Sequence, residues 1–170
     1  MMDRLMVVLY EDLTDKESYG FMAMPTPDQY AKKVDYVLYH TYDSFELKTK
    51  IDEMVETIFY HDIEKVLFSM CTRIISSSGF GGGLRTIAHI DMDIVQKDGR
   101  VLQVEVVRPD SMDLVFRLLH DKKIIIEDPI GIEDIYKKID GVSSRSKYLT
   151  GNFGKYARKF KLDHPRRAKK

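Results

Sequence analysis

The sequence has little of several features that define whole classes of proteins. It contains one cysteine, Cys71, among 170 residues, which excludes an internal disulfide and a cysteine-based zinc finger. No apolar run approaches the roughly 18 residues of a membrane helix; the longest pure run in the second half is Ile124-Ile125-Ile126. The first four residues lead into a strand-like segment without the apolar region of a signal peptide. We therefore expect a cytoplasmic protein with no membrane contact.

The composition is that of a folded chain. The sequence is 44% hydrophobic and 32% charged, which is enough apolar material to form a core and enough charge to solvate its surface. Its length fits one domain of ordinary size, or a small domain with an appendage. The sequence contains no internal repeats.

The net charge of zero conceals a strong asymmetry. From Arg145 to the C-terminus there are ten bases and one acid, which leaves 17 bases and 26 acids in the first 144 residues. We predict a domain over residues 1–144 and a basic tail over 145–170. The cations of this tail could neutralise phosphates, and its aromatic residues could stack on bases. The alternative is that the tail folds back on the acidic body. The predicted nucleic-acid contacts in the tail are Arg145, Lys147, Lys155, Arg158, Lys159, Lys161, Arg166 and Arg167, with Tyr148, Phe153, Tyr156 and Phe160 among them.

Local patterns predict a mixture of strands and helices. Apolar and β-branched runs indicate strands at residues 4–10, 35–42 and 123–127. Capping residues followed by apolar residues three and four apart indicate helices at 26–33, 43–59, 62–75, 131–140 and from Ser111. On this pattern Cys71 lies on the apolar stripe of the 62–75 helix, in the core. The predicted fold class is α+β, with a mixed sheet and a central antiparallel hairpin flanked by helices.

Residues 84–108 form the predicted hairpin, and its loop length decides which side chains share a face. A three-residue loop, Lys97-Asp98-Gly99, puts Asp91 opposite Glu105 and glycine at the left-handed position that such loops favour. A two-residue Asp98-Gly99 turn would instead place Glu105 among apolar residues. We choose the three-residue loop because it sorts the strands into one apolar and one polar face. The apolar face carries Ala88, Ile90, Met92, Ile94, Leu102, Val104 and Val106, and the polar face His89, Asp91, Asp93, Gln103 and Glu105.

The polar face predicts a metal site. Asp91 and Glu105 face each other, and like charges placed opposite one another destabilise a sheet. A divalent cation such as Mg²⁺ or Mn²⁺ would remove the repulsion, and it can activate water for attack on a phosphodiester. The predicted metal ligands are His89, Asp91, Asp93 and Glu105, a set that also suits Zn²⁺ or Fe²⁺. The alternative is a solvent-exposed polar face screened by Arg85, Arg108 or Lys97.

The same region resembles the core of the PD-(D/E)XK nuclease superfamily, which includes the archaeal Holliday-junction resolvases. In that family the core begins with a helix and a Gly/Ser-rich segment that contains an arginine. A strand with an aspartate, a short turn, a strand that ends in Glu-x-Lys and a second helix then follow. The corresponding pieces are residues 63–75, 77–85, Asp93-Ile94-Val95, 97–99, Val104-Glu105-Val106 and the helix from Ser111. The resemblance implies that Asp93 and Glu105 are catalytic, with Arg85 among the nucleic-acid contacts.

One departure from the family changes what we expect. The family's lysine falls on Val107, which cannot position or activate a water molecule, so the expectation shifts from cleavage towards binding. Three hypotheses follow. The chain is a metal-dependent nuclease-like protein acting on DNA or RNA, a non-enzymatic nucleic-acid-binding protein that uses its tail, or an α+β module that binds another protein or forms a homo-oligomer.

Overall fold

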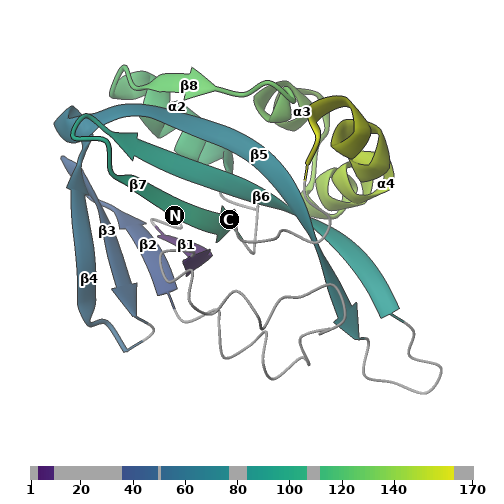
Figure 1. Ribbon diagram of the computed structural model, residues 1–170, viewed down its shortest axis with the longest axis horizontal. Helices are drawn as coiled ribbons and strands as arrows, with labels where there is room; N and C mark the ends of the chain where they lie inside the picture. Colours follow the sequence, from purple (N-terminus) through teal and green to yellow (C-terminus); the bar gives the residue numbers. More distant parts are fainter. Residues whose placement is uncertain (1–3, 10–35, 50, 77–83, 107–111, 163–170) are drawn as a thin grey trace.

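The fold is an α+β arrangement of one large sheet and three α-helices (Figure 1). The computed structural model describes residues 4–9, 36–49, 51–76, 84–106 and 112–162. Its strands are β1 (Arg4–Leu9), β2 (Tyr36–His40), β3 (Ser44–Thr49), β4 (Met54–Phe59), β5 (Ile63–Ser76), β6 (Leu84–Gln96), β7 (Val101–Val106) and β8 (Ile125–Glu127). Its helices are the 3-10 helix η2 (Tyr60–Asp62) and the α-helices α2 (Met112–Asp121), α3 (Ile132–Lys138) and α4 (Val142–Phe160).

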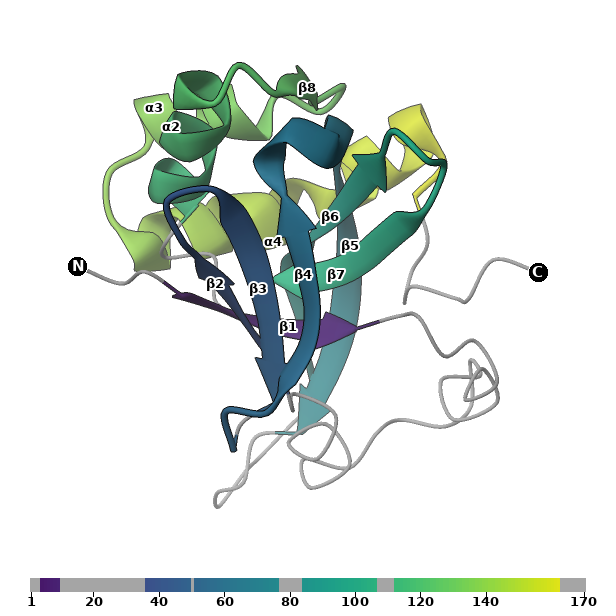
Figure 2. The same cartoon turned by 90° about the vertical axis from the view of Figure 1, so that its left-hand side faces the viewer.

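The sheet is mixed, with the predicted hairpin at its centre. The strand order is β4-β3-β2-β1-β7-β6-β5-β8. All neighbours are antiparallel except β5 and β8, which are parallel. The sheet is strongly curved, so that β2, β3 and β4 turn away from the long strands β5 and β6 (Figure 2). The structure therefore confirms the predicted fold class.

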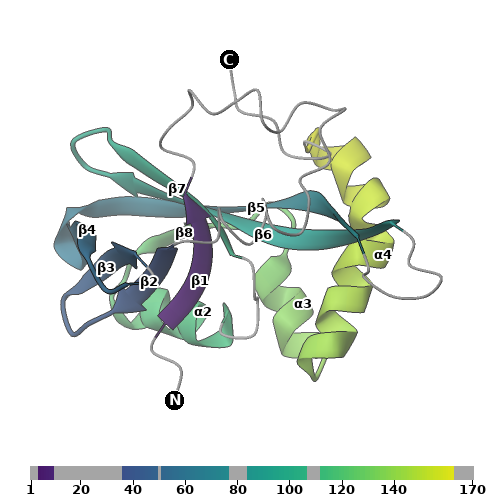
Figure 3. The same ribbon diagram turned by 90° about the horizontal axis from the view of Figure 1, so that it is seen from below.

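One face of the sheet and the helices form the core. Figure 3 shows α2 and α3 on one side of β5 and β6, and α4 packs against the same two strands. The contact is direct, since the ring centroids of Phe68 on β5 and Phe116 on α2 lie 4.8 Å apart. Every residue of the predicted apolar hairpin face is buried and belongs to this core. The other face of the hairpin is therefore the one available for a polar site.

The hairpin has the predicted loop and register. The backbone N–H of Gln96 donates to the carbonyl of Arg100 at 2.8 Å, and Asp91 pairs with Glu105. Gly99 has a φ of +87°, a left-handed conformation that glycine adopts without a steric penalty. The three-residue loop is confirmed.

The helix predicted over residues 43–59 is wrong, because this segment forms β3 and β4. Of the predicted apolar stripe, Ile51, Met54, Val55 and Phe59 are 41 to 76% exposed, so the spacing of three and four did not mark a buried helix face. The chain reverses at Asp52, whose φ is 66°. Pairing with β2 outweighed the local helical pattern, as tertiary context often does.

The helix predicted over residues 62–75 is also wrong, because the segment forms the long strand β5 after η2. Val66, Phe68 and Met70 are at most 1% exposed and face the core. Cys71 is buried as well, but it belongs to the opposite face. A strand that is apolar on both faces can imitate a helical stripe, and periodicity alone does not separate the two. Thirteen residue pairs with β6 fix the strand.

Residues 145–160 of the predicted basic tail belong to α4, which packs into the core. The strand near residue 125 and the helices α2 and α3 occur where they were predicted, whereas the boundary drawn between residues 144 and 145 falls inside α4. Leu149 and Phe153 on α4 are 0% and 5% exposed and join the core. The backbone N–H of Ala88 on β6 donates to Thr150 Oγ1 at 3.1 Å. The predicted 26–33 helix and residues 163–170 lie outside the described residues.

No helix among the described residues is both long and apolar enough to cross a membrane.

Candidate functional sites

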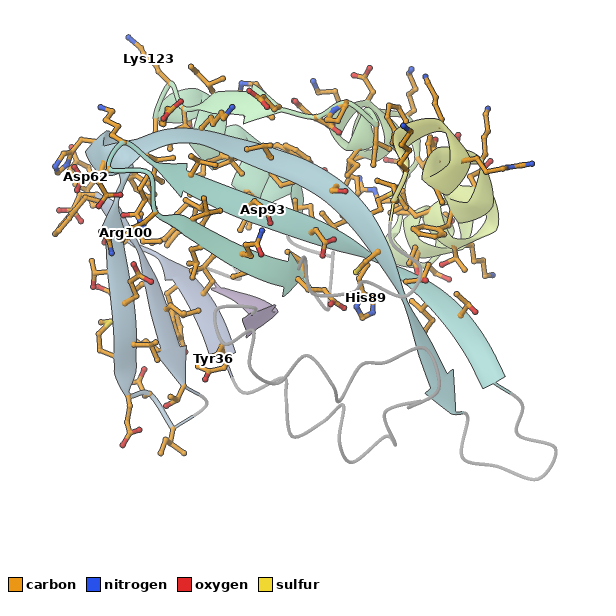
Figure 4. The ribbon with its side chains drawn as sticks, in the orientation of Figure 1. Tyr36, Asp62, His89, Asp93, Arg100 and Lys123 are labelled. Atoms are coloured by element: carbon orange, nitrogen blue, oxygen red, sulfur yellow. The ribbon has the colours of Figure 1, made fainter. Side chains whose placement is uncertain are left out.

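The polar face of the hairpin is buried where its acids meet. His89 and Asp91 on β6 are each 5% exposed, and Glu105 on β7 is 0% exposed. Figure 4 shows His89 and Asp93 projecting from β6. The alternative of a solvent-exposed polar face is therefore wrong for these three buried residues. Charged groups in such a setting are costly unless they are paired, hydrogen-bonded or bound to a metal.

Three ligand-type side chains converge at this point. Cys71, Asp91 and Glu105 each offer a ligand atom, and these atoms all lie within 4.8 Å of one another. We call this group the hairpin cluster. Register explains it: Asp91 pairs with Glu105, while Cys71 on β5 lies opposite His89. Three neighbouring strands thus each contribute one member.

His89 contacts the hairpin cluster through Glu105. Its Nδ1 lies 2.5 Å from Glu105 Oε1, and both side chains are almost fully enclosed. A histidine that hydrogen-bonds a ligating carboxylate fixes its orientation, as outer-shell partners do at metal sites. In this geometry His89 can position Glu105, and its predicted role as a direct ligand stays a prediction.

Asp93, the other predicted catalytic residue, lies two residue pairs further along the hairpin. It faces Gln103, whose Nε2 donates to Asp93 Oδ2 at 3.2 Å. Asp93 does not belong to the hairpin cluster, and its predicted catalytic role beside Glu105 stays a prediction. Cys71 adds a third ligand-type side chain, which could not be predicted from the sequence because the residue was assigned to a helix.

The donor set of the hairpin cluster determines which metals suit it. A thiolate with two carboxylates fits a borderline cation such as Zn²⁺, for which cysteine sulfur and carboxylate oxygen are both ordinary ligands. Mg²⁺ prefers oxygen ligands alone. A cation would also neutralise two carboxylates that face each other in a buried setting, and it would favour the deprotonated thiol.

The outer face of α4 carries exposed cations. Leu149 and Phe153 face inwards, so the opposite side of the helix faces solvent. This outward side contains Gly151 and Gly154, where an added Cβ would meet no atom within 4 Å. The helix contains no aspartate or glutamate. We call the exposed basic residues of α4 and of its C-cap position the α4 cations, and they are Lys147, Lys155, Arg158, Lys159 and Lys161.

The remaining predicted nucleic-acid contacts are Arg145, Arg85, Arg166 and Arg167, and none of them belongs to the α4 cations. Arg145 is engaged within the protein: its Nε donates to the Ile139 carbonyl at 2.7 Å, and it forms a 2.7 Å ion pair with Asp113. The side chain of Arg85 and all of Arg166 and Arg167 lie outside the described residues.

The aromatic residues of α4 divide between the core and the surface. Phe153 is buried, so the prediction that it stacks on bases is wrong, whereas Tyr148 is 39% exposed. Tyr156 is half-buried; burial, with a hydrogen bond to Tyr148, raises its pKa to about 12. Tyr148 is therefore the best exposed aromatic side chain of the helix.

Comparison with protein-family models and with curated proteins found no match to the chain. The hairpin cluster and the α4 cations are therefore the features that point to a function.

Proposed function

We propose that the protein binds nucleic acid through the outer face of α4. The observation that carries the proposal is a helix without an acid that carries four exposed cations, with a fifth at its C-cap residue Lys161. Lysine and arginine neutralise backbone phosphates and release condensed counterions, which supplies most sequence-independent affinity. A rigid helix holds its cations at fixed spacing, so less entropy is lost on binding than with a flexible tail.

The shape of this face favours a close approach to a phosphate backbone. At about 1.5 Å per residue, the stretch from Lys147 to Lys161 extends roughly 21 Å. Gly151 and Gly154 leave open space between the cations. Glycine in a helix interior costs about 1 kcal/mol relative to alanine, and no packing contact explains it at either position. Tyr148 adds an exposed ring on which a base can stack.

The proposal is binding without cleavage. Glu105 is fully buried, so a scissile phosphate cannot contact its carboxylate in this conformation, and Val107 stands where the nuclease family has its lysine. The strand–turn–strand–helix part of the nuclease resemblance has counterparts in β6, β7 and α2, whereas its preceding helix is the strand β5. We therefore propose at most a non-catalytic relationship to that superfamily.

The test compares two charge-matched variants. The first changes Lys147, Lys155, Arg158 and Lys161 to glutamine. The control changes four exposed lysines on other parts of the surface to glutamine: Lys97, Lys123, Lys137 and Lys138. Binding to a fluorescent single-stranded oligonucleotide, as DNA and as RNA, should weaken at least about tenfold in the first variant only. Equal losses in both variants would indicate general charge attraction and contradict the proposal.

A second function is favoured by the hairpin cluster. We propose that Cys71, Asp91 and Glu105 bind a divalent cation, with Zn²⁺ preferred over the Mg²⁺ or Mn²⁺ suggested by the carboxylates alone. The supporting observation is three ligand atoms of mixed type within 4.8 Å in a buried setting. The bound metal would supply charge neutralisation and a link between β5, β6 and β7. No role in cleavage is proposed for it.

Thermal unfolding with added metal tests this second proposal. A cation that binds only the folded state raises the melting temperature by mass action. We expect stabilisation by Zn²⁺ in the wild type and in Asp93→Asn, and its loss in Asp91→Asn. Asp93→Asn is the matched control because Asp93 lies outside the hairpin cluster. The same shift in wild type and Asp91→Asn would contradict the assignment.

A further inference from the structure

A surface cleft of about 500 Å³ lies where α2, α3 and the start of α4 meet. Phe116 on α2 and Tyr136 on α3 line it, and both are at most 3% exposed. Their ring centroids are 6.2 Å apart with the planes steeply inclined. The two rings border the cleft, but neighbouring atoms cover them almost completely. The volume of the cleft falls in the range of small-molecule sites.

Arg145 closes one side of the cleft and is held in place. Its guanidinium lies 4.5 Å from the centre of the Tyr136 ring. It donates to the Tyr136 and Ile139 carbonyls at the end of α3, and to Asp113 at 2.7 Å. These contacts use three of the five N–H donors of a guanidinium, so the group is oriented while keeping donors to offer.

The charges around the cleft do not balance. Asp113 is paired with Arg145, and Glu133 accepts from Lys137 at 2.7 Å and contacts His120 at 2.9 Å. Both acids are thereby neutralised by groups of the cleft itself. Arg117 also lines the cleft, is exposed, and makes no ion pair with the described residues. The cleft therefore presents an excess of positive charge, that of Arg117.

We propose that this cleft binds a small organic anion that carries a carboxylate or a phosphate monoester. Arg117 binds the anionic group, because a guanidinium matches both head groups with two parallel hydrogen bonds. Arg145 and Lys137 offset the charges of Asp113 and Glu133, so the positive charge of Arg117 is not cancelled within the cleft. This site is separate from the hairpin cluster and from the α4 cations.

Calorimetric titration with three matched probes tests the proposal. Phenyl phosphate and benzoate carry the two head groups on the same ring, and benzamide is the neutral control. At constant ionic strength, at least one anion should bind while benzamide does not, and the tighter anion identifies the head-group class. Failure of both anions to bind, or equal binding of benzamide, would overturn the proposal.

Two variants locate the binding. Arg117→Gln should weaken binding of the preferred anion at least about tenfold, the usual effect of losing a charged hydrogen-bond pair. Lys138 is an exposed cation of α3 that does not line the cleft, so Lys138→Gln should change the affinity less than twofold. Lys155→Gln on α4 should have no effect, which separates this site from nucleic-acid binding. An unchanged affinity in Arg117→Gln would refute the assignment.

Discussion

The buried contact between His89 and Glu105 makes a strong prediction about stability. The two side chains are 6% and 0% exposed, and their atoms approach to 2.5 Å. Removing one of them by His89→Ala leaves the other polar group enclosed without this partner. Breaking a buried pair in this way typically costs about 3–5 kcal/mol, because the remaining group loses its partner and cannot regain water.

The size of this loss can be compared with that of a surface histidine. The side chain of His61 is 76% exposed beside Asp62, and an exposed pair is worth at most about 1 kcal/mol. His89→Ala should therefore lower the free energy of unfolding several times more than His61→Ala. Replacing both buried partners by leucine should cost less than the sum of the two single replacements, because no unpaired group then remains.

Urea unfolding followed by circular dichroism measures these free energies. A chelator in every sample keeps metal binding out of the comparison. If His89→Ala is no more destabilising than His61→Ala, the His89–Glu105 contact does not hold this side of the sheet together, and the positioning role of His89 fails with it.

Three further predictions concern the helices. Phe153→Ala should lower the free energy of unfolding by about 3–5 kcal/mol in urea titration, because the side chain is buried in the core; a loss below about 1 kcal/mol would contradict the docking of α4. Gly154→Ala should raise stability by about 0.5–1 kcal/mol in the same assay, since an added Cβ meets no atom within 4 Å; destabilisation would contradict it. Desolvation raises the pKa of Glu133, but hydrogen bonds with Lys137 and His120 outweigh it, so the net pKa lies below the ordinary 4.5. Ionised Glu133 therefore stabilises the folded state above about pH 4.5, and this stabilisation disappears as the pH falls through the lowered pKa. The free energies of unfolding of wild type and Glu133→Gln should differ at pH 6 and converge at low pH. A difference that does not change with pH would refute this prediction.

Alternation along the hairpin was enough to predict its register, its loop and its buried apolar face. The loop length followed from Gly99 and from the sorting of the faces. The opposition of Asp91 and Glu105 followed from the register. Such local rules succeed because each hairpin strand has one apolar and one polar face, which leaves a single consistent pairing.

The segments that were mispredicted lack that clear alternation. In β4 the apolar residues Met54, Val55 and Phe59 are exposed, and in β5 both faces carry apolar side chains. Their spacing imitates a helix, and only pairing with strands distant in sequence decides the outcome. The error over β5 also hid Cys71, because its place opposite His89 exists only in the strand pairing. The place of Cys71 in the hairpin cluster therefore became visible only from the pairing of β5 with β6.

The salt dependence of the affinity decides whether the α4 cations bind nucleic acid. Deleting the basic segment would remove Leu149 and Phe153 from the core, so substitutions of surface charge are the appropriate change. For a single-stranded oligonucleotide, the slope of log affinity against log salt should fall in magnitude by about 0.7 for each cation that contacts a phosphate. Changing Lys147, Lys155, Arg158 and Lys161 to glutamine should therefore lower the slope by up to about 3, with an unchanged melting temperature. An unchanged slope in this folded variant would contradict the account.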